Sequence, residues 1–278
     1  FIRSEVVPAE EQIEADDAVP ERIIEQCRSM GLYGFTIPEQ YGGLGLTVSE
    51  EVRLAFELGW TTPALRSLFG TNNGIAGHVL LEGGTEEQKA QWLPKLASGE
   101  VTASFGLTEA DAGSDPSALA TKAVRDGSGS GDWVLNGSKR YITNSPVADV
   151  IMVFAKTNPD VPGNRGISTF LVPKGTPGLS IGPRDHKMGQ LGAWTADVHL
   201  DDVRVPAANL VGGADGVDTG FVTAAKCLAH GRLHIAAVCV GMAERLVHES
   251  VEFARTREQG GKPIARFQLC LLYTSTSP

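Results

Sequence analysis

The sequence predicts an α+β protein: an N-terminal α-helical domain, a middle antiparallel β-barrel or sandwich domain, and the start of a C-terminal helical bundle. Three observations indicate this order. Apolar residues recur at helical spacing up to about residue 100, short β-branched and aromatic runs between turn residues follow, and a helical pattern then extends from Gly220 to Arg257. We place the domains at residues 1–100, 101–215 and 216–268, with a tail at 269–278.

The N-terminal part predicts helices with clear start signals. One helix is expected over residues 21–30 and another from Pro63 to the Gly83–Gly84 pair. In a capping box, a side chain and a backbone N–H three residues apart bond reciprocally at a helix start. Two such boxes are present, Thr47 with Glu50 and Thr85 with Gln88. The Gly- and Pro-rich stretch 31–45 is expected to be a loop.

The middle part predicts strands. Turn residues recur every 8–15 positions with no helical pattern between them, which favours antiparallel pairing over a parallel sheet. Asn136–Gly137 is expected to be a turn between two of these strands. The predicted strands are Trp133–Leu135, Arg140–Thr143, Val150–Ala155, Ile167–Val172 and Ala196–Leu200.

The last helical stretch is too long for one small domain. At 1.5 Å per residue it spans ~55 Å, so its apolar stripe requires partner helices, which the following residues do not supply. The chain therefore reads as C-terminally truncated. Residues 269–278 show no helical continuation and are interpreted as non-native read-through, the alternative being a genuine irregular tail.

Composition and charge exclude several classes of function. The net charge is −9, and lysines and arginines form no run, which argues against nucleic-acid binding. No apolar stretch approaches the ~18 residues of a membrane span. The four cysteines form no metal-binding or disulfide pattern, so no metal is expected, and a reducing, cytoplasmic compartment fits best.

One stretch with chemical potential is Ser104–Asp115, which reads SFGLTEADAGSD. A strand leads into a turn where backbone N–H groups and the Thr108 hydroxyl could bond the pyrimidine edge of a flavin. Gly113 would allow a phosphate to approach the backbone closely. Taken alone, this loop also fits an ordinary solvated turn.

A second stretch, Lys139–Asn144, reads KRYITN. On a strand, Tyr141 and Thr143 share one face. That face could stack on a ring system and donate a hydrogen bond to it. Taken alone, the stretch also fits a plain half-buried strand.

Together, in this order and about thirty residues apart, the two stretches resemble the acyl-CoA dehydrogenase family. The family pattern is an aromatic-x-x-TEPxAGSD loop followed by K-x-W-I-T-N. The resemblance extends over residues 20–268 and includes KMG, DDVRVP, GRLHIAA and TREQGGKPIARFQ in the family's order.

The resemblance implies FAD as cofactor and assigns residues to it. Phe105, Leu107 and Thr108 would line the flavin, with Gly113 and Ser114 near the pyrophosphate. Tyr141, where the family has Trp, and Thr143 would cover the flavin face and reach its N5 atom. Arg257 and Gln259 would contact the FAD of a neighbouring subunit, although Gly260 replaces the Phe that usually follows.

The resemblance also implies an acyl-CoA substrate. Ser114, Leu228 and Arg232 match substrate-side positions, whereas Ala229 replaces a common Asp and leaves the acyl class open. The expected reaction is the α,β-dehydrogenation of fatty acid β-oxidation, with electron-transfer flavoprotein as electron acceptor. A homodimer or homotetramer is expected for the complete enzyme.

The catalytic base is missing from the pattern. The reaction needs a carboxylate of raised pKa, which most members carry late in the chain and a minority carry at the position of Gly231. We therefore assign no catalytic residue; Glu109 and Glu244 are weak candidates. Two alternatives stay open: a flavin oxidase or monooxygenase on the same scaffold, and a non-catalytic relative that binds flavin or acyl-CoA.

Overall fold

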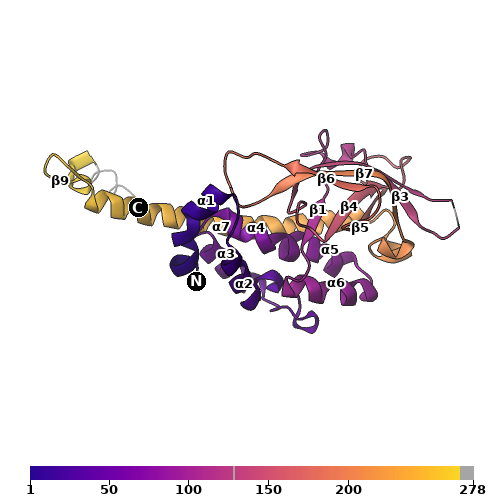
Figure 1. Ribbon diagram of the computed structural model, residues 1–278, viewed down its shortest axis with the longest axis horizontal. Helices are drawn as coiled ribbons and strands as arrows, with labels where there is room; N and C mark the ends of the chain where they lie inside the picture. The colour runs from indigo at the N-terminus through magenta and orange to yellow at the C-terminus, as the bar shows by residue number, and fades with distance from the viewer. Residues whose placement is uncertain (128, 270–278) are drawn as a thin grey trace.

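The computed structural model describes residues 1–127 and 129–269. A helical layer lies against one side of a curled sheet, and one long helix runs alongside both and projects beyond them (Figure 1). The α-helices are α1 (Glu10–Asp16), α2 (Glu21–Ser29), α3 (Val48–Leu58), α4 (Pro63–Gly70), α5 (Ala76–Gly83), α6 (Glu86–Ser98) and α7 (Gly220–Thr256). The strands are β1 (Ala103–Gly106), β2 (Lys122–Arg125), β3 (Trp133–Thr143), β4 (Val150–Lys156), β5 (Ile167–Pro173), β6 (Leu179–Arg184), β7 (Thr195–Val205), β8 (Glu258–Gln259) and β9 (Lys262–Pro263). The tail residues 270–278 lie outside the described residues.

Both predicted capping boxes are present. The Thr47 hydroxyl accepts from the Glu50 N–H, and the Glu50 carboxylate accepts from the Thr47 N–H, at the start of α3. Thr85 and Gln88 make the same reciprocal bonds at the start of α6. Each box satisfies two backbone N–H groups that a helix start leaves free.

The single helix predicted from Pro63 to Gly84 is wrong. It is divided into α4 and α5 by a π-helical segment, Thr71–Ile75. The buried Asn73 amide donates to the carbonyls of Leu32 and Phe69 (2.7 and 3.0 Å). Because two buried asparagines in this segment bond groups on neighbouring elements, they compete with a regular helical backbone.

The seven-stranded sheet is mixed rather than purely antiparallel, which corrects the prediction for this domain. Its order is β1-β4-β2-β3-β7-β6, with β5 on the other edge of β4. β1 runs parallel to β4, with Ala103 opposite Val150. Parallel pairing is possible because the β2–β3 hairpin lies between β1 and β4 in the chain and supplies the long crossover.

β4 separates two cores because its side chains alternate between two faces. Val150, Met152 and Phe154 pack against the helices, in a core that includes Leu80 of α5 and Leu93 of α6. The intervening residues of β4 pack inside the curl of the sheet with residues of β3 and β7. Both faces are therefore buried, which explains why this strand reads as a continuous apolar run.

The turn predicted at Asn136–Gly137 is also wrong. β3 continues through it, and its pairing with β7 shifts register there and again between Lys139 and Ile142. A Cβ at Gly137 would lie 2.4 Å from the Thr121 hydroxyl oxygen, so close backbone approach requires glycine at this bulge.

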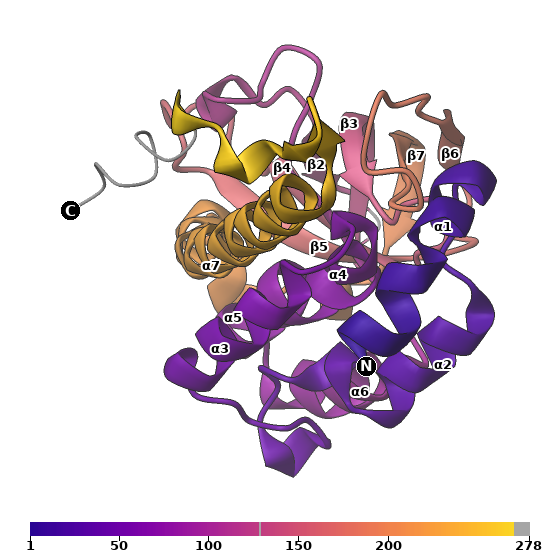
Figure 2. The same cartoon turned by 90° about the vertical axis from the view of Figure 1, so that its left-hand side faces the viewer.

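α7 is 37 residues long and packs across α3 and α5 (Figure 2). Glycines allow α3 and α7 to touch: a Cβ at Gly241 would lie 2.1 Å from the Phe56 carbonyl oxygen, and one at Gly59 would lie 2.3 Å from that of Val238. Toward its C-terminal end, α7 exposes large apolar side chains, including Leu246, Val247, Val251 and Phe253.

Within residues 1–127 and 129–269, none of the helices combines the length and hydropathy needed to cross a bilayer. The cysteines of the same region, Cys27, Cys227 and Cys239, are free thiols. Burial raises the pKa of Cys27 and of Cys227 to about 12, so both stay protonated at neutral pH.

Candidate flavin and acyl-CoA site

The structure brings the two sequence motifs together. The loop after β1 lies beside the second half of β3, because the Arg140 N–H donates to the Thr108 carbonyl (2.9 Å). Within β1, the Ser104 hydroxyl donates to the Thr143 carbonyl (2.8 Å). These bonds join residues more than thirty positions apart, so the two motifs are held side by side.

A buried ion pair fixes the same junction. The Lys139 ammonium lies 2.7 Å from the Glu109 carboxylate, with side-chain exposures of 0% and 8%. Glu109 also accepts from the Thr121 hydroxyl and N–H. Burial acts to raise the Glu109 pKa, but Lys139 and these hydrogen bonds hold it below its ordinary value. Glu109 is therefore an ionised structural residue, and a carboxylate of lowered pKa is a poor base.

The aromatic side chain of the second motif lies on a distorted part of the strand. Tyr141 has φ +58°, at the bulge between Lys139 and Ile142, and 62% of its surface is exposed. The Arg140 guanidinium lies 4.4 Å from its ring centroid, and Arg140 is itself paired with Asp197 (2.6 Å). A left-handed tyrosine is strained, and such strain is typical of binding sites. An exposed, oriented aromatic ring suits stacking on a flavin.

The rest of the first motif offers accessible backbone. Gly113 and Ser114 are exposed, and a Cβ at Gly113 would have no heavy atom within 4 Å. Thr108 is half-buried, whereas Leu107 is buried beneath it. Phe105 packs on Phe154 with ring centroids 4.7 Å apart. Open backbone, a hydroxyl and an apolar floor fit the edge and phosphates of a flavin dinucleotide.

Of the three predicted substrate-side residues, Ser114 lies in the loop after β1 and the other two lie on α7. Leu228 is partly buried against the helical core, and Arg232, one turn further on, is exposed and makes no ion pair in the described part of the chain. Gly231 is buried, yet a Cβ built on it would have no heavy atom within 4 Å. This glycine leaves space beside the helix where larger residues would project.

Arg257 and Gln259 are not brought to the motifs. Arg257 caps the C-terminal end of α7 and Gln259 lies in the short β8–β9 hairpin that follows, which Figure 1 shows at the opposite end of the molecule from the seven-stranded sheet. Both are exposed. Within one chain these two residues are therefore too far from the two motifs to contact the same FAD. They could contact only an FAD that is bound by another subunit.

A buried cluster of titratable side chains escaped the sequence prediction. The Glu51 carboxylate of α3 lies 2.8 Å from Nε2 of His230 and 3.1 Å from Nδ1 of His234, both on α7. Burial acts to raise the Glu51 pKa, but the two histidines lower it to about 2. The spacing of His230 and His234 by one helical turn was the available signal, but nothing in the sequence indicated Glu51 as the partner.

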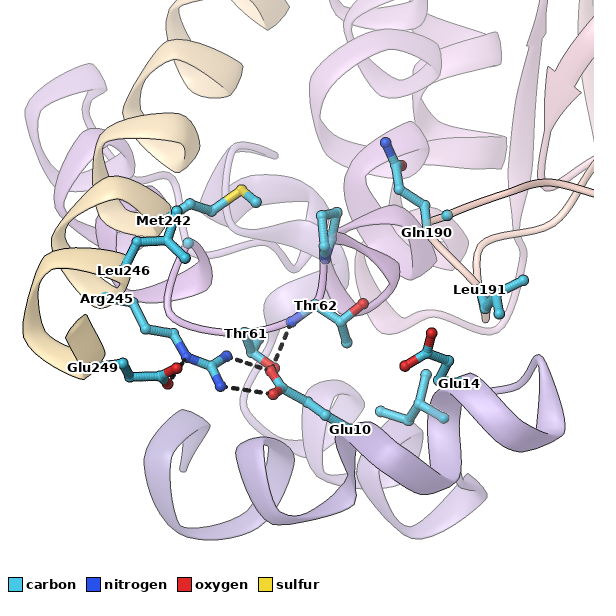
Figure 3. A pocket seen from close by; sticks show the side chains of 14 residues that line it. Glu10, Glu14, Thr61, Thr62, Gln190, Leu191, Met242, Arg245, Leu246 and Glu249 are labelled. Atoms are coloured by element: carbon cyan, nitrogen blue, oxygen red, sulfur yellow. Dashed lines mark hydrogen bonds and ion pairs between the residues drawn. The ribbon is translucent and has the colours of Figure 1, made fainter. Parts of the chain in front are cut away.

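A surface pocket of about 410 Å³ lies elsewhere, between α1, α7 and residues 189–191 (Figure 3). Arg245 holds the Glu10 carboxylate from one side (2.6 and 2.8 Å), and Thr61 and Thr62 donate to it from the other. Glu249 accepts from the Arg245 Nε–H. These charges are mutually satisfied, so they stabilise the junction of α1 with α7.

Most of the chain matches three family models. The acyl-CoA dehydrogenase N-terminal domain matches residues 1–100, the middle domain matches residues 104–203, and the C-terminal domain matches residues 218–273. These matches agree with the helical, sheet and long-helix parts of the structure.

Individual relatives agree. An acyl-CoA dehydrogenase of Bacillus subtilis (strain 168) is 39% identical over 268 residues, which are 96% of this chain and 69% of that protein. The caffeyl-CoA reductase–Etf complex subunit CarC of Acetobacterium woodii is 36% identical, over 93% of this chain and 66% of its own length. The structure of butyryl-CoA dehydrogenase from Megasphaera elsdenii is 32% identical, with a TM-score of 0.90 over 98% of this chain and 70% of that one. Another related structure contains FADH2. This chain belongs to the acyl-CoA dehydrogenase family of FAD-dependent oxidoreductases.

Proposed function

We propose that this chain is the FAD- and acyl-CoA-binding part of an enzyme that dehydrogenates an acyl-CoA thioester between its α and β carbons. The observation that carries the proposal is the junction of Thr108 with Arg140 and of Ser104 with Thr143, which unites the two flavin motifs. When bound, the flavin accepts the hydride that leaves the β carbon.

The residues of this chain would bind and orient the reactants. Thr108 and Thr143 offer hydroxyls to the flavin edge, the Tyr141 ring covers its face, and the buried Glu109–Lys139 pair keeps these groups in register. Phe105 and Leu107 give the ring an apolar floor, and Gly113 and Ser114 leave backbone open to phosphate. On α7, Leu228 and Arg232 contact acyl-CoA.

We further propose that residues 1–278 do not supply the catalytic base. A base for this reaction needs a raised pKa in a dry pocket. The buried carboxylates of the described chain, Glu51 and Glu109, both have lowered pKa values because they are paired with cationic or hydrogen-bonding groups. Glu244 is exposed on α7, and Gly231 carries no side chain.

Partners and location are proposed on related grounds. CarC belongs to a complex with an electron-transferring flavoprotein, and we propose the same class of protein as electron acceptor here. The outward position of Arg257 and Gln259 and the apolar side chains exposed on α7 support a homodimer or homotetramer. Three free thiols support a reducing, cytoplasmic location.

The domain limits 1–100, 101–215 and 216–268 follow the changes from helices to sheet and back.

The test is anaerobic mixing of acyl-CoAs, octanoyl-CoA among them, with FAD-loaded protein while flavin bleaching is followed. A longer natural protein containing this chain should bleach, whereas residues 1–278 alone should bleach at least ~10²-fold more slowly, the usual effect of a missing base. Rapid bleaching by residues 1–278 would overturn the proposal on the base. Rapid oxidation of the reduced flavin by oxygen would favour an oxidase instead.

A further inference from the structure

Tyr141 combines an exposed ring with a strained backbone. Its φ of +58° is costly for a bulky residue, and 62% of its surface is open to solvent. A ring that is exposed to this extent changes rotamer readily unless a neighbouring group restrains it. If a flavin had to order the ring on binding, that loss of freedom would weaken the affinity. A group that already holds the ring therefore favours flavin binding.

Arg140, the residue before Tyr141, is in contact with this ring. The Cζ atom of its guanidinium lies 4.4 Å from the ring centroid, which is a cation–π distance. On a regular strand, consecutive side chains point to opposite faces and do not meet. Here the pairing of β3 with β7 shifts register between Lys139 and Ile142, and Tyr141 is left-handed, so the two neighbouring side chains reach the same side. The strained backbone thus produces the stacked pair.

Two carboxylates from neighbouring strands hold the guanidinium in turn. Nη1 of Arg140 lies 2.6 Å from Asp197 on β7 and 3.2 Å from Asp185, which directly follows β6. Asp185 also accepts a hydrogen bond from the Thr195 hydroxyl (2.8 Å), and its N–H donates to the Thr195 carbonyl (2.9 Å). These bonds tie Arg140 to two further strands of the sheet and orient its guanidinium. The same carboxylates neutralise its charge.

We propose that Arg140 is a positioning residue for the flavin: it holds the Tyr141 ring in the orientation that stacks on the isoalloxazine, and it does not bind the phosphates of the cofactor. This inference rests on the proposed function, which places Tyr141 at the flavin face. A ring that is fixed in advance loses less entropy when the flavin binds. Because Asp197 and Asp185 already engage the guanidinium, an anionic phosphate would have to compete with both.

The test measures flavin affinity and does not depend on catalysis. FAD is titrated into the flavin-free form of a longer protein containing this chain, and binding is followed by flavin absorbance. Arg140→Met should raise the Kd for FAD by about 2- to 5-fold, the range that a partly exposed cation–π contact supports. Tyr141→Leu should raise it at least as much. The double variant Arg140→Met/Tyr141→Leu should bind no more weakly than Tyr141→Leu alone, because Arg140 then has no ring to hold.

Three further variants separate positioning from a general structural effect. Arg184→Met removes a second guanidinium, 4.5 Å from the ring centroid of Trp194 and outside both motifs, and should leave the Kd for FAD unchanged. Arg140→Lys keeps the charge but not the planar stack, so its Kd should be intermediate. Asp197→Asn keeps both stacked groups and loosens the guanidinium, so it should weaken FAD binding by a smaller factor than Arg140→Met. In a Tyr141→Leu background, Asp197→Asn should have no effect.

Riboflavin, which has the ring system of FAD but no phosphate, distinguishes contact with the ring from contact with phosphates. Arg140→Met should weaken riboflavin and FAD binding by the same factor. An effect on FAD alone, or an equal effect of Arg140→Met with and without the Tyr141 ring, would show that Arg140 binds phosphate and would overturn this inference only. An unchanged FAD affinity and flavin spectrum in Tyr141→Leu would instead refute the proposed flavin site, and this inference with it.

Discussion

Lys139 and Glu109 form a buried ion pair, with 2.7 Å between Nζ and Oε1, that joins the strand carrying Tyr141 to the loop carrying Thr108. Both side chains are too buried to contact a ligand extensively. The pair nevertheless sets the distance between the loop that carries Thr108 and the strand that carries Tyr141. The Lys139 ammonium also approaches the Leu107 carbonyl (3.4 Å), so it holds both ends of the turn between Leu107 and Glu109.

Removing one member of this pair should be costly. Lys139→Met leaves the Glu109 carboxylate buried without its cation and should lower the free energy of unfolding by about 3–5 kcal/mol. The double variant Lys139→Met/Glu109→Gln should recover most of that loss, because no charge then remains uncompensated and the glutamine carbonyl can still accept from Thr121. Urea denaturation of both variants measures the coupling. A single variant as stable as the parent would show that the pair does not hold the junction.

The Glu51 cluster predicts a pH window for stability. The Glu51 pKa falls from 4.5 to about 2 on folding, so its contribution is present above pH 4.5 and is lost as pH falls toward 2. The His230 pKa rises above 6.5 through its contact with Glu51, so its contribution is present below pH 6.5 and is lost as pH rises through the folded value. The cluster should therefore stabilise most between pH 4.5 and pH 6.5.

Glu51→Gln tests this window. Within this pH window, the free energy of unfolding of the variant should be lower than that of the parent by about 1.5–3 kcal/mol, the value of a hydrogen bond to a charged group. The difference in free energy between variant and parent should become smaller toward pH 3 and toward pH 9. The control is Glu57→Gln on the exposed face of α3, which should show a small difference. A Glu51→Gln effect that is constant with pH would show that the histidines are not coupled to this carboxylate.

Two glycines of α7 should respond oppositely to alanine. A Cβ at Gly241 would overlap the Phe56 carbonyl of α3, so Gly241→Ala should lower the free energy of unfolding by about 1–3 kcal/mol as the helices move apart. Gly231→Ala meets no atom and should raise it by about 0.5–1 kcal/mol, because alanine favours the helix. Thermal unfolding of both variants measures these changes in stability. If Gly231→Ala lowers the stability, the space beside Gly231 must be occupied by other atoms of the protein.

Thr143 should contribute to flavin binding. Thr143→Ala in a longer, catalytically active protein containing this chain should shift the flavin absorption spectrum and slow bleaching by acyl-CoA, because a lost hydrogen bond near N5 is worth ~0.5–1.5 kcal/mol. Ser180→Ala removes an exposed hydroxyl from the outer strand β6 and should change neither quantity. An unchanged spectrum and rate in Thr143→Ala would remove Thr143 from the proposed site.

Local chemistry determined much of the fold directly from the sequence. Both capping boxes, the end of α2 near Gly31 and the 37-residue span of α7 depend on side chains and backbone within a few positions of each other. The motifs of the acyl-CoA dehydrogenase family are also local strings, so the family could be identified before any pairing of strands was known.

The tertiary structure decided what depends on contacts between distant residues. The break between α4 and α5 follows from Asn73 bonding Leu32, and the bulge at Gly137 follows from the approach of Thr121. Whether Glu109 was a base or a structural ion could not be read from its neighbours in sequence, because the answer lies in Lys139, thirty positions away. The same holds for Glu51 and the α7 histidines: a carboxylate acquires its pKa from the groups that folding places around it, and the linear sequence does not contain those distances.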